Sequence, residues 1–192
     1  MLLQTHIAFK EWAVVCAALE RGRQSLILRK GGIHEGREGF RVQHDEFWLF
    51  PTGFHQQADD VVADARPLLE QVQATEQAQV NEASRISLDL YAVVSDVHYV
   101  ADLATLRRLS GHHIWSNKTV DQRFHYRSPG LFVLTVRIYR RATLIELEVT
   151  PHMSGCKSWV DLPSTISTGE LRPVIEDEAF EKQRSEINAL LS

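Results

Sequence analysis

The sequence has few cysteines and no long apolar run. Its only cysteines, Cys16 and Cys156, are 140 positions apart, a spacing that gives no framework for disulfides or structural zinc. Near the N-terminus, the stretches without Asp, Glu, Lys or Arg cover residues 1–9 and 12–19, far short of the roughly 20 residues that span a bilayer. Residues 1–6 lack the basic and apolar regions of a signal peptide. We therefore expect a cytoplasmic protein without a membrane-spanning helix.

The sequence also lacks a strong charge excess and a diagnostic catalytic motif. Its 21 basic and 25 acidic side chains leave a formal charge of −4 among 192 residues, of which 44% are hydrophobic. A chain of this length can bury a core without disulfides or metals. We expect one compact domain over residues 1–192, with four parts that differ in periodicity: residues 1–56, 57–83, 84–160 and 161–192.

Charge alternates between these four parts, which carry balances of +1, −5, +4 and −4. The most basic window is 107–141, where eight Lys or Arg side chains face Asp121 alone and leave a charge of +7. Aromatic residues are interleaved with these cations. Cations neutralise phosphates and rings stack on bases, so the mixture is typical of a nucleic-acid surface, although a solvated basic face has the same composition.

The main hypothesis is therefore a nucleic-acid-binding module for DNA or RNA. Side chains expected to contact phosphates are Arg123, Arg127, Arg137 and Lys157, with Arg29 and Lys30 extending the same surface. Trp115 or Tyr126 is expected to stack on a base. Arg dominates the basic window and suits bidentate phosphate contacts. No cofactor is predicted under this hypothesis.

Periodicity predicts an α+β protein. Helical spacing favours helices over 8–21, 57–83, 103–109 and 176–191, with a kink at Pro67 in the second. Alternation favours strands over 24–29, 47–50, 86–94, 131–139 and 143–149, and residues 123–127 would form a basic face if extended. The predicted order is an N-terminal helix with short strands, a long acidic helix, a mostly antiparallel β region and a C-terminal helix. Trp12 and Trp48 lie among aliphatic residues and are expected in the core.

A glycine-rich segment follows two of the candidate cations. Residues 29–36 place Arg29 and Lys30 before a glycine pair, where backbone N–H groups could approach a phosphate closely. The segment does not match a P-loop, and neither do residues 155–158. An ordinary glycine-rich turn would have the same sequence.

A metal-dependent nuclease or phosphodiesterase is the first alternative. Glu146 and Glu148 are two apart in a predicted strand, so both carboxylates face one side and could hold Mg²⁺ beside a phosphate. Further metal-ligating side chains occur in the first third, at His34, Glu35, His44, Asp45 and His55. Their gaps of ten and eleven residues match neither structural zinc sites nor a helical His pair.

Cys156 is a candidate nucleophile, since His152 and Lys157 are close in sequence and could lower a thiol pKa. A small buried residue near a turn is the plainer interpretation. A protein–protein interaction module without nucleic acid is the second alternative, and a homo-oligomer or a protein partner stays open.

Several strings resemble a family of bacterial proteins catalogued as domain of unknown function 1802. They are Lys10-Glu11-Trp12, Leu28-Arg29-Lys30-Gly31-Gly32-Ile33, Phe47-Trp48-Leu49-Phe50-Pro51-Thr52, His55-Gln56 and Gly155-Cys156-Lys157-Ser158-Trp159. Gly53-Phe54 departs from the more polar pair expected before His55. The resemblance implies no established reaction. It implies a link to restriction or defence functions, and the β-rich half resembles small PUA-like barrels that bind nucleic acid.

Overall fold

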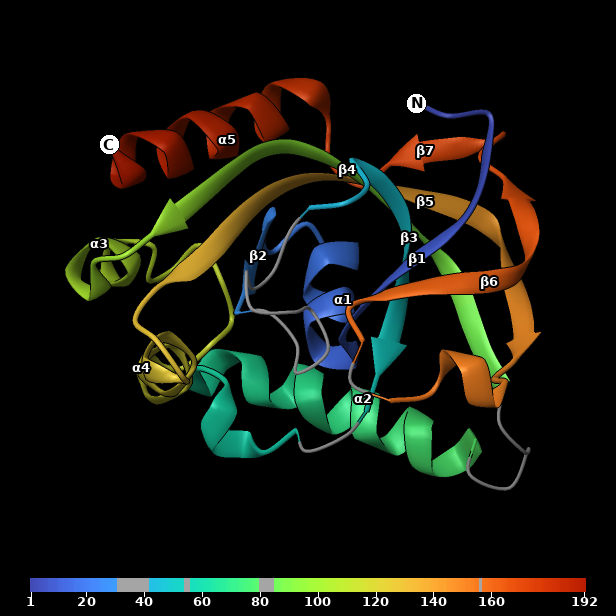
Figure 1. Ribbon diagram of the computed structural model, residues 1–192, viewed down its shortest axis with the longest axis horizontal. Helices are drawn as coiled ribbons and strands as arrows, with labels where there is room; N and C mark the ends of the chain where they lie inside the picture. The colour runs from blue at the N-terminus through green and yellow to red at the C-terminus, as the bar shows by residue number, and fades with distance from the viewer. Residues whose placement is uncertain (31–41, 54–55, 80–84, 156) are drawn as a thin grey trace.

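The computed structural model describes residues 1–30, 42–53, 56–79, 85–155 and 157–192 as an α+β protein (Figure 1). Its strands are β1 (Gln4–Trp12), β2 (Leu26–Arg29), β3 (Glu46–Thr52), β4 (Arg85–Val100), β5 (Leu131–Glu148), β6 (Trp159–Ser167) and β7 (Leu171–Pro173). Its α-helices are α1 (Ala13–Glu20), α2 (Arg66–Gln79), α3 (Leu103–Arg108), α4 (Asn117–His125) and α5 (Asp177–Leu191). Short 3₁₀ turns, η1 (Ala58–Asp60), η2 (Ala63–Ala65) and η3 (Pro151–Met153), complete the described elements.

The strands form one mixed sheet in the order β2-β5-β4-β3-β1-β6, and β7 pairs with β5. Every pair is antiparallel except β1 and β3, which run parallel in a register that sets Lys10 opposite Phe50 and Glu11 opposite Pro51. β6 flanks β1 on its other side and pairs Phe9 with Trp159. The centre of the sheet therefore joins the first strand of the chain to segments about 40 and 150 residues away.

The two longest strands bend the sheet. β4 and β5 have 16 and 18 residues, and their pairing register shifts between Leu88 and Leu90 and between Val94 and Asp96. An extra residue in one strand bends it and increases its twist. In Figure 1 both strands sweep over the top of the molecule and turn downward at the right.

Two apolar cores lie on opposite faces of the sheet. Along β3, Phe47 and Leu49 belong to the larger core, whereas Trp48 and Phe50 belong to the smaller one. Successive side chains of a strand point to opposite faces, so both faces of β3 are buried. This double burial explains why residues 47–50 are apolar without interruption.

Helix α1 follows β1 directly and packs in the larger core. The backbone N–H of Val14 donates to Oε1 of Gln56 at 2.9 Å, which satisfies one of the unpaired amides at the helix start. The chain leaves the helix at Gly22, whose φ of 65° is a left-handed conformation that glycine adopts without strain. In the part of the chain that the structure describes, no helix is long and apolar enough to cross a membrane.

Much of the predicted secondary structure is confirmed. The strands expected over 24–29, 47–50 and 86–94 correspond to β2, β3 and β4, and the helices expected over 103–109 and 176–191 correspond to α3 and α5. The segments of β4, α3 and α5 each show one clear period, whereas the apolar run of residues 47–50 is too short for a helix.

The helix predicted over 8–21 is wrong in its first half, since β1 extends to Trp12 and only residues 13–20 are helical. Phe9 is buried in the larger core and Ala8 in the smaller one. A strand buried on both faces has a nearly continuous apolar sequence, which periodicity does not distinguish from a buried helix.

Three further predictions are corrected. Residues 123–127 mostly continue α4, whose start is capped by Ser116 Oγ accepting from the Thr119 N–H at 3.2 Å. Residues 131–148 form one bent strand instead of two. The acidic helix begins at Arg66, after two 3₁₀ turns, so Pro67 lies in the first turn of α2 and not within the helix. A proline in the first turn of a helix removes no helical hydrogen bond, so the reason for expecting a kink at Pro67 does not apply.

Candidate functional site

A pocket of about 1,250 Å³ opens between α1 and α2 on one side and the ends of β3 and β4 on the other. The loop that follows β5 closes a further side. The described charged side chains that line it are Lys10, Arg21, Arg29, Lys30, Arg85, Arg123 and Lys157, with Glu20, Glu76 and Asp89. The described lining therefore carries an excess of four positive charges.

Segments far apart in the sequence meet at this pocket. The lining includes Lys10 and Trp12, Arg29 and Lys30, residues 50–52, and Gly155 with Lys157. These are the segments that carry the family resemblance in the sequence. The parallel pairing of β1 with β3 brings Lys10 and Trp12 beside residues 50–52. Arg29, at the end of β2, lies beside Glu11 of β1.

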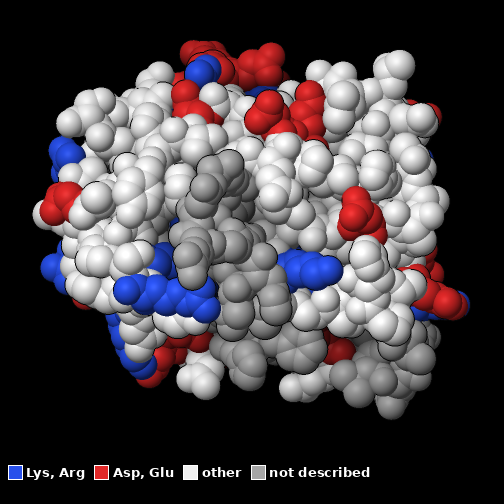
Figure 2. Space-filling view, viewed as in Figure 1, with Lys and Arg blue, Asp and Glu red and all other residues white. Residues whose placement is uncertain are grey.

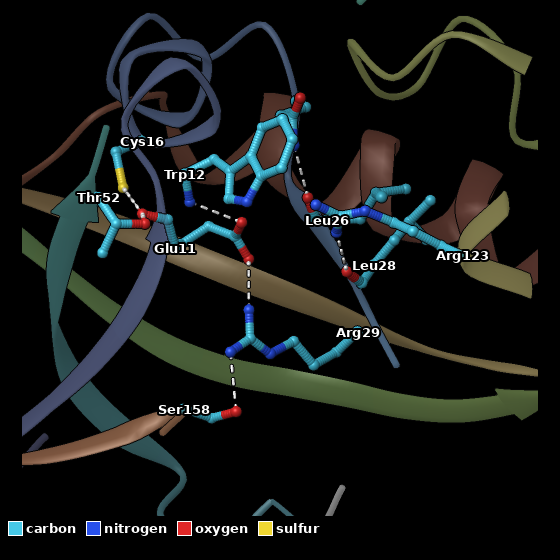
Figure 3. Close-up of polar contacts among 10 residues, drawn as sticks. Glu11, Trp12, Cys16, Leu26, Leu28, Arg29, Thr52, Arg123 and Ser158 are labelled. Atoms are coloured by element: carbon cyan, nitrogen blue, oxygen red, sulfur yellow. Dashed lines mark hydrogen bonds and ion pairs between the residues drawn. The ribbon is translucent and has the colours of Figure 1, made fainter. Parts of the chain in front are cut away.

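Glu11 forms a buried ion pair at one end of the pocket (Figure 3). Only 1% of its side chain is exposed; Oε2 lies 3.5 Å from Nη1 of Arg29 and, among the described residues, has no hydrogen-bond partner. Its Oε1 accepts the Trp12 backbone N–H at 2.8 Å. Arg29 also donates from Nη2 to Ser158 Oγ at 2.7 Å, and its Cζ lies 4.6 Å from the Phe9 ring centroid. A carboxylate, a hydroxyl and a ring thus fix this guanidinium.

Arg123 is held by aromatic rings. Its Cζ lies 4.1 Å from the ring centroid of Trp115 and 4.9 Å from that of Trp12, and the two indoles meet edge to face at 4.7 Å. Nη1 donates to the Leu28 carbonyl at 3.3 Å. Burial lowers the pKa of Arg123 to about 10, against the opposing charge of Glu11. The group remains protonated at neutral pH, so it is a second fixed cation.

Lys30 ties the end of β2 to the loop after α4. Its Nζ donates to the carbonyl oxygens of Phe124 at 2.8 Å and Gly130 at 2.7 Å, and also to that of Ser128. Burial lowers the pKa of Lys30. Because Lys30 also lines the pocket, it places the loop 126–130 beside the basic lining.

Six of the eight predicted binding residues lie in or next to this region. Arg29, Lys30, Arg123 and Lys157 line the pocket. Tyr126 is 49% exposed, and Cζ of the exposed Arg127 lies 5.3 Å from its ring. Lys157 is exposed and, among the described residues, has no hydrogen-bond or ion-pair partner. Figure 2 shows Lys and Arg gathered at the lower left, over α4, and one smaller basic patch to the right of centre.

The other two predicted residues are buried, Trp115 behind the pocket and Arg137 against α5. Trp115 is 2% exposed and packs against Arg123. The Arg137 side chain is 6% exposed, with Nη2 2.6 Å from Oδ1 of Asp177 and Cζ 4.8 Å from the Phe180 ring. In this structure Trp115 is too buried to stack on a base, and Arg137 is too buried to contact a phosphate. Trp115 positions Arg123, and Arg137 holds α5 on the sheet.

The described residues do not assemble the metal site of the nuclease alternative. His34, Glu35, His55 and the candidate nucleophile Cys156 lie outside the described residues. His44 packs against Trp159, with ring centroids 5.1 Å apart, while Asp45 and His152 are exposed. Glu146 and Glu148 are exposed on β5; Glu146 lies 3.8 Å from Arg85. Within the described ranges no three His, Cys, Asp or Glu side chains are grouped to hold a metal ion.

Sequence reasoning gave no role to Glu11, Glu20 or Asp89, and Glu11 entered it only within a string that carries the family resemblance. One signal for Glu11 was available, because residues 7–19 contain only one acid and one lysine, side by side. A charged side chain within an apolar segment is buried only when it is paired. Trp12 was expected in the core and lines the pocket as well.

The chain belongs to the family described as Domain of unknown function (DUF1802), whose model matches residues 8–186. No curated protein matches the chain. Among solved structures, it is similar to an ASCH protein from Zymomonas mobilis, at 11% identity and a TM-score of 0.41, covering 93% of this chain and 93% of that chain. A point mutant of the Zymomonas mobilis protein gives 10% identity and a TM-score of 0.42, covering 96% of this chain and 98% of that chain. Nothing about function follows from similarity at this level.

Proposed function

We propose that the protein binds single-stranded nucleic acid at the basic pocket and the adjoining loop 126–130. The observation that carries the proposal is the pair of fixed guanidinium groups, Arg29 and Arg123, near one buried carboxylate, Glu11. Two positive charges facing one negative charge leave a net positive site. An anionic ligand that enters the site would balance its positive charge.

The fixed geometry favours phosphate as the anion. Arg29 is oriented before any ligand arrives, because Glu11, Ser158 and the Phe9 ring hold it. A planar guanidinium that is already oriented loses little side-chain entropy when it binds phosphate oxygens. Lys157 adds a flexible cation at the rim.

The size and walls of the pocket support a ligand larger than an inorganic anion. Its volume of about 1,250 Å³ exceeds the few hundred Å³ that small ligands occupy. Trp12, which is partly exposed, is among the lining residues, and an aromatic ring provides a stacking surface for a base. Phosphate contacts and ring contacts in one pocket fit a nucleotide unit.

A path for the rest of a strand leads from the pocket to the loop after α4. Lys30 lines the pocket and bonds to three carbonyls of that loop region. Tyr126 and Arg127 are exposed there, with the guanidinium over the phenol ring. This is an accessible cation and ring of the kind that single-stranded nucleic-acid surfaces use.

The test is fluorescence anisotropy of labelled single-stranded DNA and RNA of equal length, titrated with the full chain at several salt concentrations. We expect the logarithm of the binding constant to fall linearly with the logarithm of salt concentration, by roughly 0.7 per phosphate contact. Lys157→Ala should reduce that slope by about one contact, because its side chain is exposed and contributes nothing described to folding.

Lys182→Ala is the matched control, since Lys182 is also exposed and lies on α5, across the molecule from α2 in Figure 1. Its slope should equal that of the unmodified chain. Absence of binding at low salt, or equal losses in the two lysine variants, would contradict the proposal. Running each sample on a denaturing gel with Mg²⁺ present tests the nuclease alternative, which requires cleaved label.

A further inference from the structure

The pocket has acidic groups as well as cations, and two of the acids lie near the C-terminal end of α1. Glu20 and Asp89 both line the pocket, and Arg140 bridges them at 2.8 Å and 3.0 Å. Glu20 ends α1, whereas Glu11 and Trp12 precede its first residue, Ala13. At a rise of 1.5 Å per residue, the seven steps from Ala13 to Glu20 span about 10 Å.

The wall between these two ends is one face of α1. Ala13, Cys16 and Ala17 line the pocket there. Burial raises the pKa of Cys16, and the charges of Glu11, Asp89 and Glu20 raise it further. Cys16 therefore lies within electrostatic reach of the carboxylates at both ends. Its neighbours are small, so this wall leaves room for the flat face of a ring.

We infer that the pocket holds one unpaired nucleotide, with its phosphate at Arg29 and Lys157 and with an amino-bearing edge of its base at Glu20 and Asp89. This inference rests on the proposed nucleic-acid binding and specifies which part of the nucleic acid enters. A phosphate and the far edge of its base are separated by about the length of α1. Carboxylates only accept hydrogen bonds, so they select an edge that donates, such as the amino group of cytosine.

The arrangement also explains why the base must be unpaired. In a duplex the edge that carries the amino donor is occupied by the partner base, and the stacked ring has no free face for the pocket wall. Enzymes and binding proteins that take a base into a pocket therefore act on single strands or displace the base from the helix.

Arg140 leaves both Glu20 and Asp89 a further carboxylate oxygen for a ligand, because it contacts only one oxygen of each.

The test compares labelled twelve-residue oligodeoxycytidine and oligodeoxythymidine by anisotropy, at pH 7.5 and one salt concentration, with the full chain. Both are weakly stacked pyrimidine strands with the same phosphates, and only the first carries an exocyclic amino group. We expect the cytidine oligomer to bind about tenfold more tightly. In Asp89→Asn and, separately, Glu20→Gln the ratio should fall below about twofold, because each amide can both donate and accept.

The amide variants keep an oxygen for Arg140 and differ from the native residues by one atom, which preserves the packing. Glu20 is 30% exposed, so Glu20→Gln provides a second test should Asp89→Asn unfold. Glu148→Gln, on the exposed part of β5, is the control and should keep the tenfold ratio. Equal affinity for both oligomers, or a preference that survives in both variants, overturns this inference while salt-dependent binding sustains the proposed function. Failure of both oligomers to bind overturns the proposed function itself.

Discussion

Replacing Glu11 by Gln should have opposite effects on stability and on anion binding. Glu11 is buried and its Oε2 lies 3.5 Å from Arg29 Nη1. The amide removes the charge but keeps an oxygen for the Trp12 N–H. The folded protein then contains two fixed guanidinium groups, those of Arg29 and Arg123, without their counter-charge. A ligand phosphate no longer competes with a carboxylate for them.

The magnitude follows from the geometry. At 3.5 Å and an effective dielectric constant of 20, the direct Coulomb attraction is about 5 kcal/mol, which is an upper figure for the pair. Breaking one partner of a buried pair costs about 3–5 kcal/mol. We expect a loss near the lower end, about 3 kcal/mol, since the amide still accepts one hydrogen bond. For a chain of 192 residues this lowers the melting temperature by roughly 6–12 °C.

The assays are thermal unfolding by circular dichroism and anisotropy with a single-stranded oligonucleotide, the latter well below the melting temperature. Affinity should rise about threefold, the effect of removing one unit charge near a phosphate. Glu148→Gln should change neither quantity. An unchanged melting temperature would show that the negative charge of Glu11 does not stabilise the fold by offsetting the charges of Arg29 and Arg123. A loss of affinity together with stability would show that Glu11 contributes more by orienting Arg29 than it costs by competing with the ligand.

Three more predictions concern side chains around the site. Burial lowers the pKa of His113 from 6.5 to about 4, so the unfolded chain binds a proton that the folded chain does not. The free energy of unfolding should fall by on the order of 2–3 kcal/mol between pH 7.5 and 4.5 in urea titrations, and His113→Asn should remove most of that fall. Arg137→Ala should lower the melting temperature by several degrees, since it removes the anchor of α5, without changing the salt slope of oligonucleotide binding; a reduced slope would return Arg137 to the binding surface. Lys30→Met should speed amide hydrogen exchange in residues 126–130 relative to α5, because three carbonyls lose their donor; equal protection in the variant would refute that role.

Sequence patterns identified the elements with a single period and also the short apolar run of β3, but they failed at the doubly buried β1. The C-terminal helix has one apolar stripe, with Phe180 and Ile187 buried, and its prediction is confirmed. β1 has the opposite character, since adjacent residues enter different cores. No local pattern separates such a strand from a buried helix. The capping pair Ser116 and Thr119 was the overlooked signal for α4.

The candidate site was predictable in part. Arg29, Lys30, Arg123 and Lys157 were chosen for their charge, and the structure places them around one pocket. Counting charges does not reveal which arginines are held in place by other side chains, because those side chains come from distant strands and helices. Arg137 illustrates the limit, as its neighbours in sequence are strand residues while its partner Asp177 is 40 positions away. Pairing of this kind depends on topology, which the charge pattern does not contain.

The position of β1 also has a consequence for biosynthesis. This strand is synthesised before both of its partners, since it lies between β3 and β6 in the sheet, and its pairing of Ala8 with Val160 spans about 150 residues. Contacts of such long range close slowly and leave an unpaired strand edge during synthesis. Glu11 and Trp12 lie on that edge, whereas their neighbours Arg29 and Ser158 lie far along the chain. The basic pocket is therefore among the last features to form, and a nascent chain lacks it until β6 has docked.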